Sequence, residues 1–183
     1  MHKLKLYLDT TVLNFAFADD APKEKEETLK FFKQVDRFEV NISDVVLDEI
    51  GNCPALKRTH MMDIINRYEW DIIELDQPAK DLAARYISEG VIPVKYRDDA
   101  YHIAIASVNN LDAILSWNFQ HIVKMKTKRE VVGINLIEGY KPIDIYTYNT
   151  PLNSDHWLRC KSVVKSPNRG GQNEEASAVS ERV

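Results

Sequence analysis

Five short apolar runs recur along the first 147 residues, and stretches with helical periodicity lie between them. A short apolar run bounded by polar residues is typical of a strand buried in a parallel sheet. Strands that alternate with helices indicate parallel crossovers, with helices on both faces of the sheet. The sequence therefore predicts an α/β fold: a three-layer α/β/α sandwich with a central parallel five-stranded sheet. The expected strands are residues 4–8, 38–42, 70–75, 113–116 and 143–147.

Capping and turn-forming residues delimit the expected helices. Ser43 is a favoured N-cap for the segment that follows it. Pro78 suits the first turn of another helix, and Gly90 suits the position just beyond its end. The expected helices are residues 23–35, 44–50, 55–68, 78–89, 96–108 and 128–138, with a further helical stretch over 118–123.

The alternating pattern ends near residue 153. Residues 166–183 are rich in Ser, Gly, Asn and Glu, a composition that buries too little apolar surface to fold. We therefore expect one domain over residues 1–152 and a disordered C-terminal tail over residues 153–183.

Composition excludes several classes of function. The net charge is −4, whereas proteins that hold nucleic acid by electrostatics alone are usually basic. Any nucleic-acid contact must therefore be local or mediated by a cation. No stretch approaches the ~18 uninterrupted apolar residues that a membrane span requires, and the N-terminus becomes acidic at Asp9, too early for a signal-peptide core. Cys53 and Cys160 lack any zinc-like spacing, which favours a reduced cytoplasmic protein.

Acidic side chains are expected near the carboxyl ends of the strands, where open parallel sheets bind their ligands. These carboxylates would repel one another, and the sequence offers no equal cluster of Lys or Arg to neutralise them. Mg²⁺ or Mn²⁺ prefers carboxylate and water oxygens, so such an ion would relieve the repulsion and supply positive charge for phosphodiester chemistry. The candidates are Asp9, Glu49 and the pair Asp98–Asp99, with the polar Ser116 and Asn118 after the fourth strand.

Four segments resemble, in order and spacing, the four motifs of PIN domains. The first is LYLDTTV at 6–12, and the second is SDVVLDEI at 43–50. The third is DAYHIAIA at 99–106, an Asp that heads a helix of small residues. The fourth is LSWNFQHI at 115–122, where Asn follows a hydroxyl-bearing residue. The resemblance covers roughly residues 4–148.

The resemblance implies a PIN-like fold and a metal-dependent endoribonuclease that hydrolyses phosphodiester bonds of single-stranded RNA. An enzyme of this family is most often the VapC-like toxin of a type II toxin–antitoxin pair. The resemblance therefore implies RNA and a small antitoxin protein as partners, in the cytoplasm. The resemblance leaves undecided whether the protein forms a homodimer, and we expect no membrane partner. Asp9, Glu49 and Asp99 match the family's acids that bind Mg²⁺ or Mn²⁺, and Asn118, where the family often has Asp, completes the catalytic set. Secondary candidates are Asp98, Thr10 and Ser116, the last standing where Thr is more usual.

Each acidic residue also has a simpler interpretation. Asp9 could only cap the helix that follows it, since Asp is a favoured N-cap. Glu49 could be a solvated helix residue, and its neighbour Asp48 could be the functional acid instead. Helical periodicity does not choose between Asp98 and Asp99, whereas the resemblance favours Asp99.

Other polar residues near the motifs allow two interpretations. His102 shares a helix face with the aspartates, and we expect a buried histidine that forms hydrogen bonds and positions its helix, rather than a metal ligand. We expect His121 and Trp117 to contribute to packing. A basic run beyond Asn118 is either a solvated face or a strip that contacts RNA phosphates. It consists of Lys124, Lys126, Lys128 and Arg129.

Two other functions compete with the nuclease. A haloacid-dehalogenase-like phosphatase also begins with Asp after the first strand, but that chemistry needs a second Asp two residues later, where this chain has Thr11. A non-catalytic PIN-like module would bind RNA or a protein without cleaving it. The presence of all three principal acids argues against that alternative.

Overall fold

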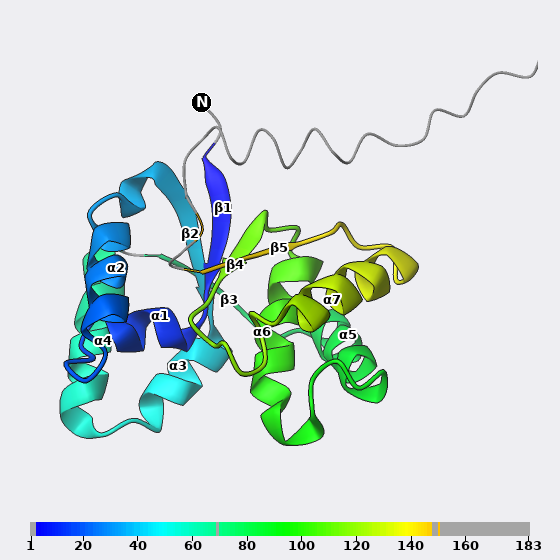
Figure 1. The fold of residues 1–183 in the computed structure, drawn as a ribbon, viewed down its shortest axis with the longest axis horizontal. Coiled ribbons are helices and arrows are strands. Elements are labelled where there is room, and N and C mark those ends of the chain that lie inside the picture. Colours follow the sequence, from blue (N-terminus) through cyan, green and yellow to red (C-terminus); the bar gives the residue numbers. More distant parts are fainter. Residues whose placement is uncertain (1–2, 69, 148–149, 151–183) are drawn as a thin grey trace, which may run out of the picture. The chain divides into compact units, whose positions relative to one another are not determined.

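The computed structural model describes residues 3–68, 70–147 and 150. In this part of the chain, five strands alternate with helices (Figure 1). The strands are β1 (Leu4–Leu8), β2 (Phe38–Ser43), β3 (Asp71–Ile73), β4 (Ala113–Leu115) and β5 (Asp144–Tyr146). The helices are α1 (Thr10–Phe15), α2 (Pro22–Phe32), α3 (Asp44–Gly51), α4 (Ala55–Tyr68), α5 (Gln77–Ser88), α6 (Arg97–Val108) and α7 (Met125–Ile137), with short 3₁₀ turns at Val35–Arg37 and Val94–Tyr96.

All five strands form one parallel sheet in the order β3-β2-β1-β4-β5. The chain builds the sheet outward from β1 in one direction to β3, and then returns to add β4 and β5 on the other side. Because parallel crossovers are right-handed, this reversal places the two groups of helices on opposite faces. Accordingly α1, α2 and α4 pack together, as do α5, α6 and α7, while α3 contacts α1, α4 and α6. The predicted three-layer α/β/α sandwich is therefore confirmed.

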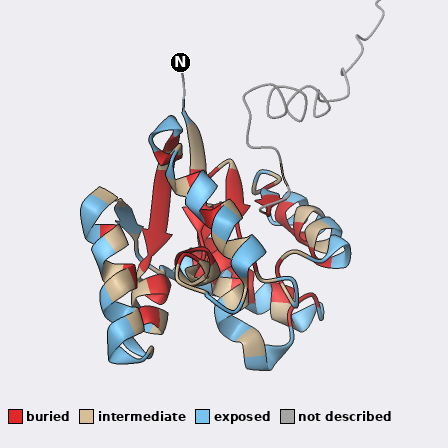
Figure 2. Cartoon of the chain, turned by 60° about the vertical axis from the view of Figure 1, so that its left-hand side comes forward, coloured by how far each residue is buried: buried red, intermediate tan, exposed pale blue. Residues whose placement is uncertain are grey.

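The central strand β1 is buried over its last three residues, and Figure 2 colours the buried residues of the sheet red. Leu6, Tyr7 and Leu8 are fully buried, as a strand covered by helices on both faces should be. Its two neighbours fix it in place, since Leu6 aligns with Val40 of β2 and with Ala113 of β4. The rigid end of this strand is what positions the residue that follows it, Asp9.

The structure differs from the sequence prediction at two loops. The helical stretch expected over residues 118–123 is wrong, because this segment is a turn. The side-chain oxygen of Asn118 accepts hydrogen bonds from the backbone N–H groups of Gln120 and His121, which competes with helix formation. The helix α1 is absent from the expected ranges, although Asp9 was a candidate cap for a helix at this place. Asp9 caps it by accepting a hydrogen bond from the Thr11 N–H at 3.1 Å.

The boundary expected at residue 152 and the tail over 153–183 lie outside the described residues. Residues Met1–Thr150 form one compact unit. Among the described helices, none combines the length and the apolar character that crossing a bilayer would require.

Candidate active site

The carboxyl ends of β1 and β4 lie side by side where the order of strand addition reverses, which is the usual ligand position in such sheets. A cavity of about 220 Å³ opens there. Its walls come from the end of β1, four helices and the loop after β4. The lining residues are Asp9, Thr10, Thr11, Asn14, Glu49, Cys53, Lys57, Met61, Asp99, His102 and Asn118.

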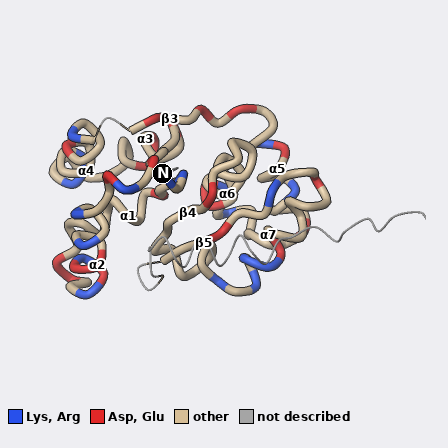
Figure 3. Tube along the Cα trace, turned by 90° about the horizontal axis from the view of Figure 1, so that it is seen from above, with Lys and Arg blue, Asp and Glu red and all other residues tan. Residues whose placement is uncertain are grey.

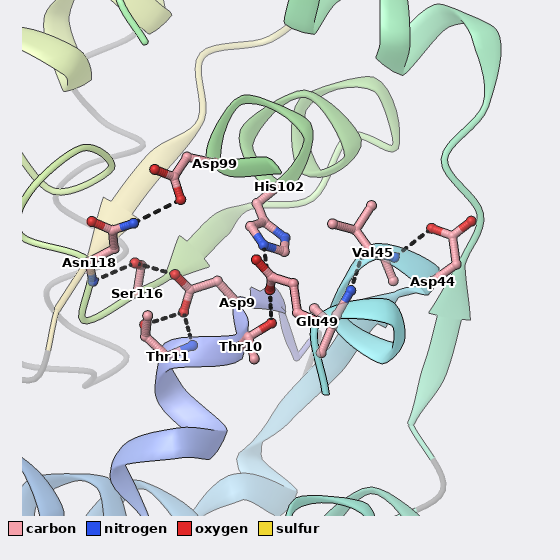
Figure 4. A network of polar contacts seen from close by, with 12 residues as sticks. Asp9, Thr10, Thr11, Asp44, Val45, Glu49, Asp99, His102, Ser116 and Asn118 are labelled. Atoms are coloured by element: carbon pink, nitrogen blue, oxygen red, sulfur yellow. Dashed lines mark hydrogen bonds and ion pairs between the residues drawn. The ribbon is translucent and has the colours of Figure 1, made fainter. Parts of the chain in front are cut away.

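Asp9 is held rigidly at the floor of this cavity, only 1% exposed (Figure 4). Its Oδ2 accepts a hydrogen bond from Ser116 Oγ at 2.6 Å, and its Oδ1 accepts one from Thr11 Oγ1 at 2.5 Å. Thr11 Oγ1 in turn accepts a bond from the Trp117 N–H at 2.9 Å. These bonds join the ends of β1 and β4 and fix the direction of the carboxylate. The helix-cap role and a functional role for Asp9 are therefore compatible.

Glu49 reaches the cavity from α3 and is held by two side chains. Its Oε2 accepts a hydrogen bond from Thr10 Oγ1 and lies 3.2 Å from His102 Nε2. Tyr7, fully buried in β1, places its hydroxyl 2.7 Å from the other ring nitrogen, Nδ1. A carboxylate can only accept, so the Nε2–H of His102 donates to Glu49. His102 is thus the buried, hydrogen-bonding histidine expected from the sequence, and it orients Glu49 as well as its own helix.

Asp99 lies in the first turn of α6 and faces the loop after β4. The side-chain N–H of Asn118 donates to Asp99 Oδ1 at 2.9 Å, and the Asn118 backbone N–H donates to Ser116 Oγ at 2.9 Å. Because its oxygen is already bonded to two backbone N–H groups, Asn118 acts here as a clamp on Asp99. Figure 4 shows this clamp beside the Asp9–Ser116 bond.

Burial and mutual repulsion disfavour the charged forms of two of the carboxyls. Burial raises the pKa of Asp9, and the nearby Glu49 adds to the effect, although His102 and two hydroxyl donors oppose it. Burial raises the pKa of Asp99 to about 6, with further contributions from Asp9, Glu49 and Asp98 against the opposing charge of His102.

The remaining pair shifts toward the charged forms. Burial alone would raise the pKa of Glu49, but the hydrogen bond and charge of His102 outweigh it, so this pKa is lowered. Burial would likewise lower the pKa of His102, but Glu49, Asp9 and Asp99 together raise it. Both shifts favour the ion pair between Glu49 and His102, and Asp9 and Asp99 add two further carboxyl groups to the same cavity.

The donor chemistry of this cavity fits a hard divalent cation. Asp9, Glu49 and Asp99 offer carboxylate oxygens, the ligands that Mg²⁺ and Mn²⁺ prefer. Within the described residues, no three Asp, Glu, His or Cys side chains form a ready-made cage for a metal ion. Mg²⁺ usually keeps several of its waters and needs only one or two protein carboxylates, so an open acidic cavity suits it better than a closed cage would.

The structure brings four of the nominated residues together and leaves others apart. Asp9, Glu49, Asp99 and Asn118 all line the cavity, as does Thr10, and Ser116 lies directly beneath Asp9. Asp98 is exposed and does not line it. The basic run at the start of α7, a blue segment in Figure 3, also lies off the cavity lining.

Two residues of that basic run already have partners. Lys128 donates to the Ile145 carbonyl at 2.6 Å, and burial lowers the pKa of its amine. Lys126 pairs with Glu130 at 3.7 Å. Trp117 is buried and donates to Thr28 Oγ1 at 2.6 Å, as expected of a packing residue.

Sequence reasoning missed the wall of the cavity that α1 and α4 provide. Asn14, Cys53, Lys57 and Met61 lie there. Helical spacing links Lys57 and Met61, which are four residues apart on α4. The break at 51–54 separates them from the Glu49 motif, so periodicity in α3 carried no information about α4.

Each of the four PIN-like motifs contributes one residue to this cavity: Asp9, Glu49, Asp99 and Asn118. The parallel five-stranded sheet and the two helical layers are those of the predicted sandwich. The fold is PIN-like.

Comparison with known proteins gives likenesses of structure only. No family model and no curated protein matches the sequence. The chain is similar to a chain of VapBC2 from Rickettsia felis bound to a promoter DNA fragment, with a TM-score of 0.49 at 13% identity over 79% of this chain and 98% of that one. DNA-bound VapBC from Salmonella typhimurium gives 0.49 at 17% identity with the same coverage. Mycobacterium tuberculosis VapC20, a sarcin–ricin loop cleaving toxin, gives 0.47 at 10% identity over 60% and 86%.

Proposed function

We propose that this protein is a metal-dependent endoribonuclease that hydrolyses phosphodiester bonds of single-stranded RNA. The observation that carries the proposal is the convergence of Asp9, Glu49 and Asp99 on one cavity at the switch point of the sheet. The PIN-like motifs supply the same three residues independently. A purely structural cluster would be expected to pair its acids with Lys or Arg. Among the described residues, the pair of Glu49 with His102 is the only ion pair that any of the three forms.

Asp9, Glu49 and Asp99 would hold Mg²⁺ or Mn²⁺ in this cavity. When bound, such an ion supplies positive charge that activates water and stabilises the negatively charged phosphate. The protein's part is positioning. Ser116 and Thr11 fix Asp9, His102 fixes Glu49, and Asn118 fixes Asp99 through hydrogen bonds. No side chain is needed as a nucleophile, since water attacks phosphorus and the ester oxygen leaves.

We further propose that the chain acts as the toxin of a type II toxin–antitoxin pair in the cytoplasm. The likeness to chains of VapBC complexes gives the class of partner to look for, a small antitoxin protein. Growth arrest on induced expression, relieved by the product of a neighbouring small reading frame, is the expected result. Expression without any effect on growth would contradict the toxin role and leave the nuclease proposal standing.

Cleavage of end-labelled single-stranded RNA tests the enzymatic proposal. We expect products with Mn²⁺ or Mg²⁺ and none with EDTA, while a generic phosphomonoester stays intact. Asp9→Asn should lose about 100-fold or more of the activity, since even residues that only support metal ligands contribute 10–100-fold. Hydrolysis of the phosphomonoester would favour the phosphatase. A folded protein that binds RNA but never cleaves it would favour the non-catalytic module.

A further inference from the structure

One cation stands in the wall of the acidic cavity. Lys57 is the only Lys or Arg among the described lining residues. It belongs to α4, where Figure 3 shows basic residues, and so comes from outside the four motif segments. The sequence alone directed attention to a different basic group, the run at residues 124–129.

The local fold explains why this lysine faces the cavity. The chain breaks at 51–54 between α3 and α4, and α4 then packs against both α1 and α3. Lys57 and Met61 are four residues apart on α4, so they share one face of the helix, and both line the cavity. Met61 is fully buried and anchors that face, while Lys57 is half-buried. Lys57 is therefore positioned at the cavity by a packed helix rather than by a free loop.

Lys57 lacks an acidic partner among the described residues. In this part of the chain it has no ion pair or side-chain hydrogen bond, although three carboxylates line the same cavity. Of these three acids, Glu49 is the nearest to Lys57 along the sequence, and it is paired with His102 at 3.2 Å instead. The side chain of Asn14, on the neighbouring α1 wall, likewise has no hydrogen-bond partner within the described residues.

We propose that Lys57, with Asn14 beside it, binds a backbone phosphate of the RNA strand and so directs the strand into the acidic cavity. The inference rests on the proposed function. A cavity lined by carboxylates repels polyanions such as RNA. Productive binding therefore needs a positive side chain next to the acids, in addition to the metal ion that the acids would hold. Lysine serves phosphate as a point charge, and a neutral amide adds a hydrogen-bond donor without sequence preference. This assigns phosphate positioning to α4 rather than to α7.

The test is RNA binding in a background that does not cleave. Asp9→Asn, Asp9→Asn/Lys57→Met and Asp9→Asn/Lys80→Met are titrated against a fluorescent single-stranded RNA at several salt concentrations. Lys80 is exposed on α5 and away from the cavity, so its variant matches the loss of charge. Cleavage by the wild-type protein and by Lys57→Met and Lys57→Arg is measured in parallel with Mn²⁺.

In the Asp9→Asn background, we expect Lys57→Met, but not Lys80→Met, to weaken RNA binding roughly three- to tenfold. The slope of log K against log salt should fall in magnitude by about 0.7, the value for one lost phosphate contact with a single strand. KM should rise by a similar factor with kcat within about threefold, and Lys57→Arg should restore most of the loss. If the wild-type protein cleaves RNA but the Lys57→Met and Lys80→Met double variants bind RNA equally well, the role of Lys57 is refuted. The proposed nuclease activity is then unaffected. If wild-type protein neither cleaves nor binds RNA, both proposals are refuted.

Discussion

Replacing Asp99 with Asn should stabilise the metal-free protein. Asn has the same shape, and its oxygen can still accept the hydrogen bond that Asn118 donates at 2.9 Å. The substitution removes only the charge. That charge is unfavourable because Asp99 is part-buried and lies near Asp9, Glu49 and Asp98.

The magnitude follows from the pKa of Asp99, which burial and repulsion raise from 3.8 to about 6. A folded-state pKa above the unfolded value means that the native state binds more protons, so stability falls as pH rises from about 4 to about 6. The full shift would cost the native state about 3 kcal/mol above pH 6. Partial exposure of the carboxylate to solvent reduces this to roughly 1–2 kcal/mol. Asp99→Asn should recover that amount at pH 7.5 and about half of it at pH 5.

Thermal melting in EDTA at both pH values measures the effect. For a domain of this size, roughly 1–2 kcal/mol corresponds to a rise in Tm of about 3–8 °C. Asp98→Asn is the matched control, because Asp98 is exposed in the same helical turn. The negative charge of Asp98 near the helix N-terminus stabilises the helix by about 0.3–1 kcal/mol. Removing this charge in the control should therefore leave Tm unchanged or lower it. A Tm that falls in Asp99→Asn, or that rises equally in both variants, would refute the reasoning that Asp99 is electrostatically frustrated.

Three further predictions concern the residues around the acids. Tyr7→Phe removes a buried hydroxyl that contacts Ser43 at 2.6 Å and His102 at 2.7 Å. It should lower the free energy of unfolding, measured by urea denaturation, by about 1–3 kcal/mol. An unchanged midpoint of unfolding would contradict this prediction. Ser116→Ala removes a donor to Asp9 and should destabilise the protein most at high pH, where that carboxylate is ionised, as melting from pH 5 to 8 would show. Mn²⁺ at 100 times its Kd should stabilise the wild-type protein by about 2.7 kcal/mol, whereas a metal-independent Tm would argue against a site.

The sheet could be predicted from the sequence because buried parallel strands leave a strong local pattern. Leu6, Tyr7 and Leu8 are apolar as a group, and the strands after them recur at intervals that only crossovers explain. The turn after Asn118 could not be predicted in the same way, since a single side chain there replaces helical hydrogen bonds. Hydrophobic periodicity reports which positions are buried, and it does not reveal hydrogen bonds between one side chain and the backbone.

The candidate site divides along similar lines. The acids at positions 9, 49 and 99 could be nominated from their places after strands and at a helix start, and the structure brings all three to one cavity. Lys57 could not be nominated, because its position depends on how α4 packs after the break at 51–54. The basic run of α7 was nominated from composition, yet Lys128 is bonded to a backbone carbonyl of β5. Local charge density does not predict which lysines face a cavity.

Titration with Mn²⁺, in which electron paramagnetic resonance follows the loss of free ion, measures the metal site itself. We predict that the wild-type protein and Asp98→Asn bind Mn²⁺, and that Asp9→Asn and Asp99→Asn lose affinity while all variants remain folded. Equal affinity in all four proteins, or no binding by the wild-type protein, would contradict a metal site built from these carboxylates.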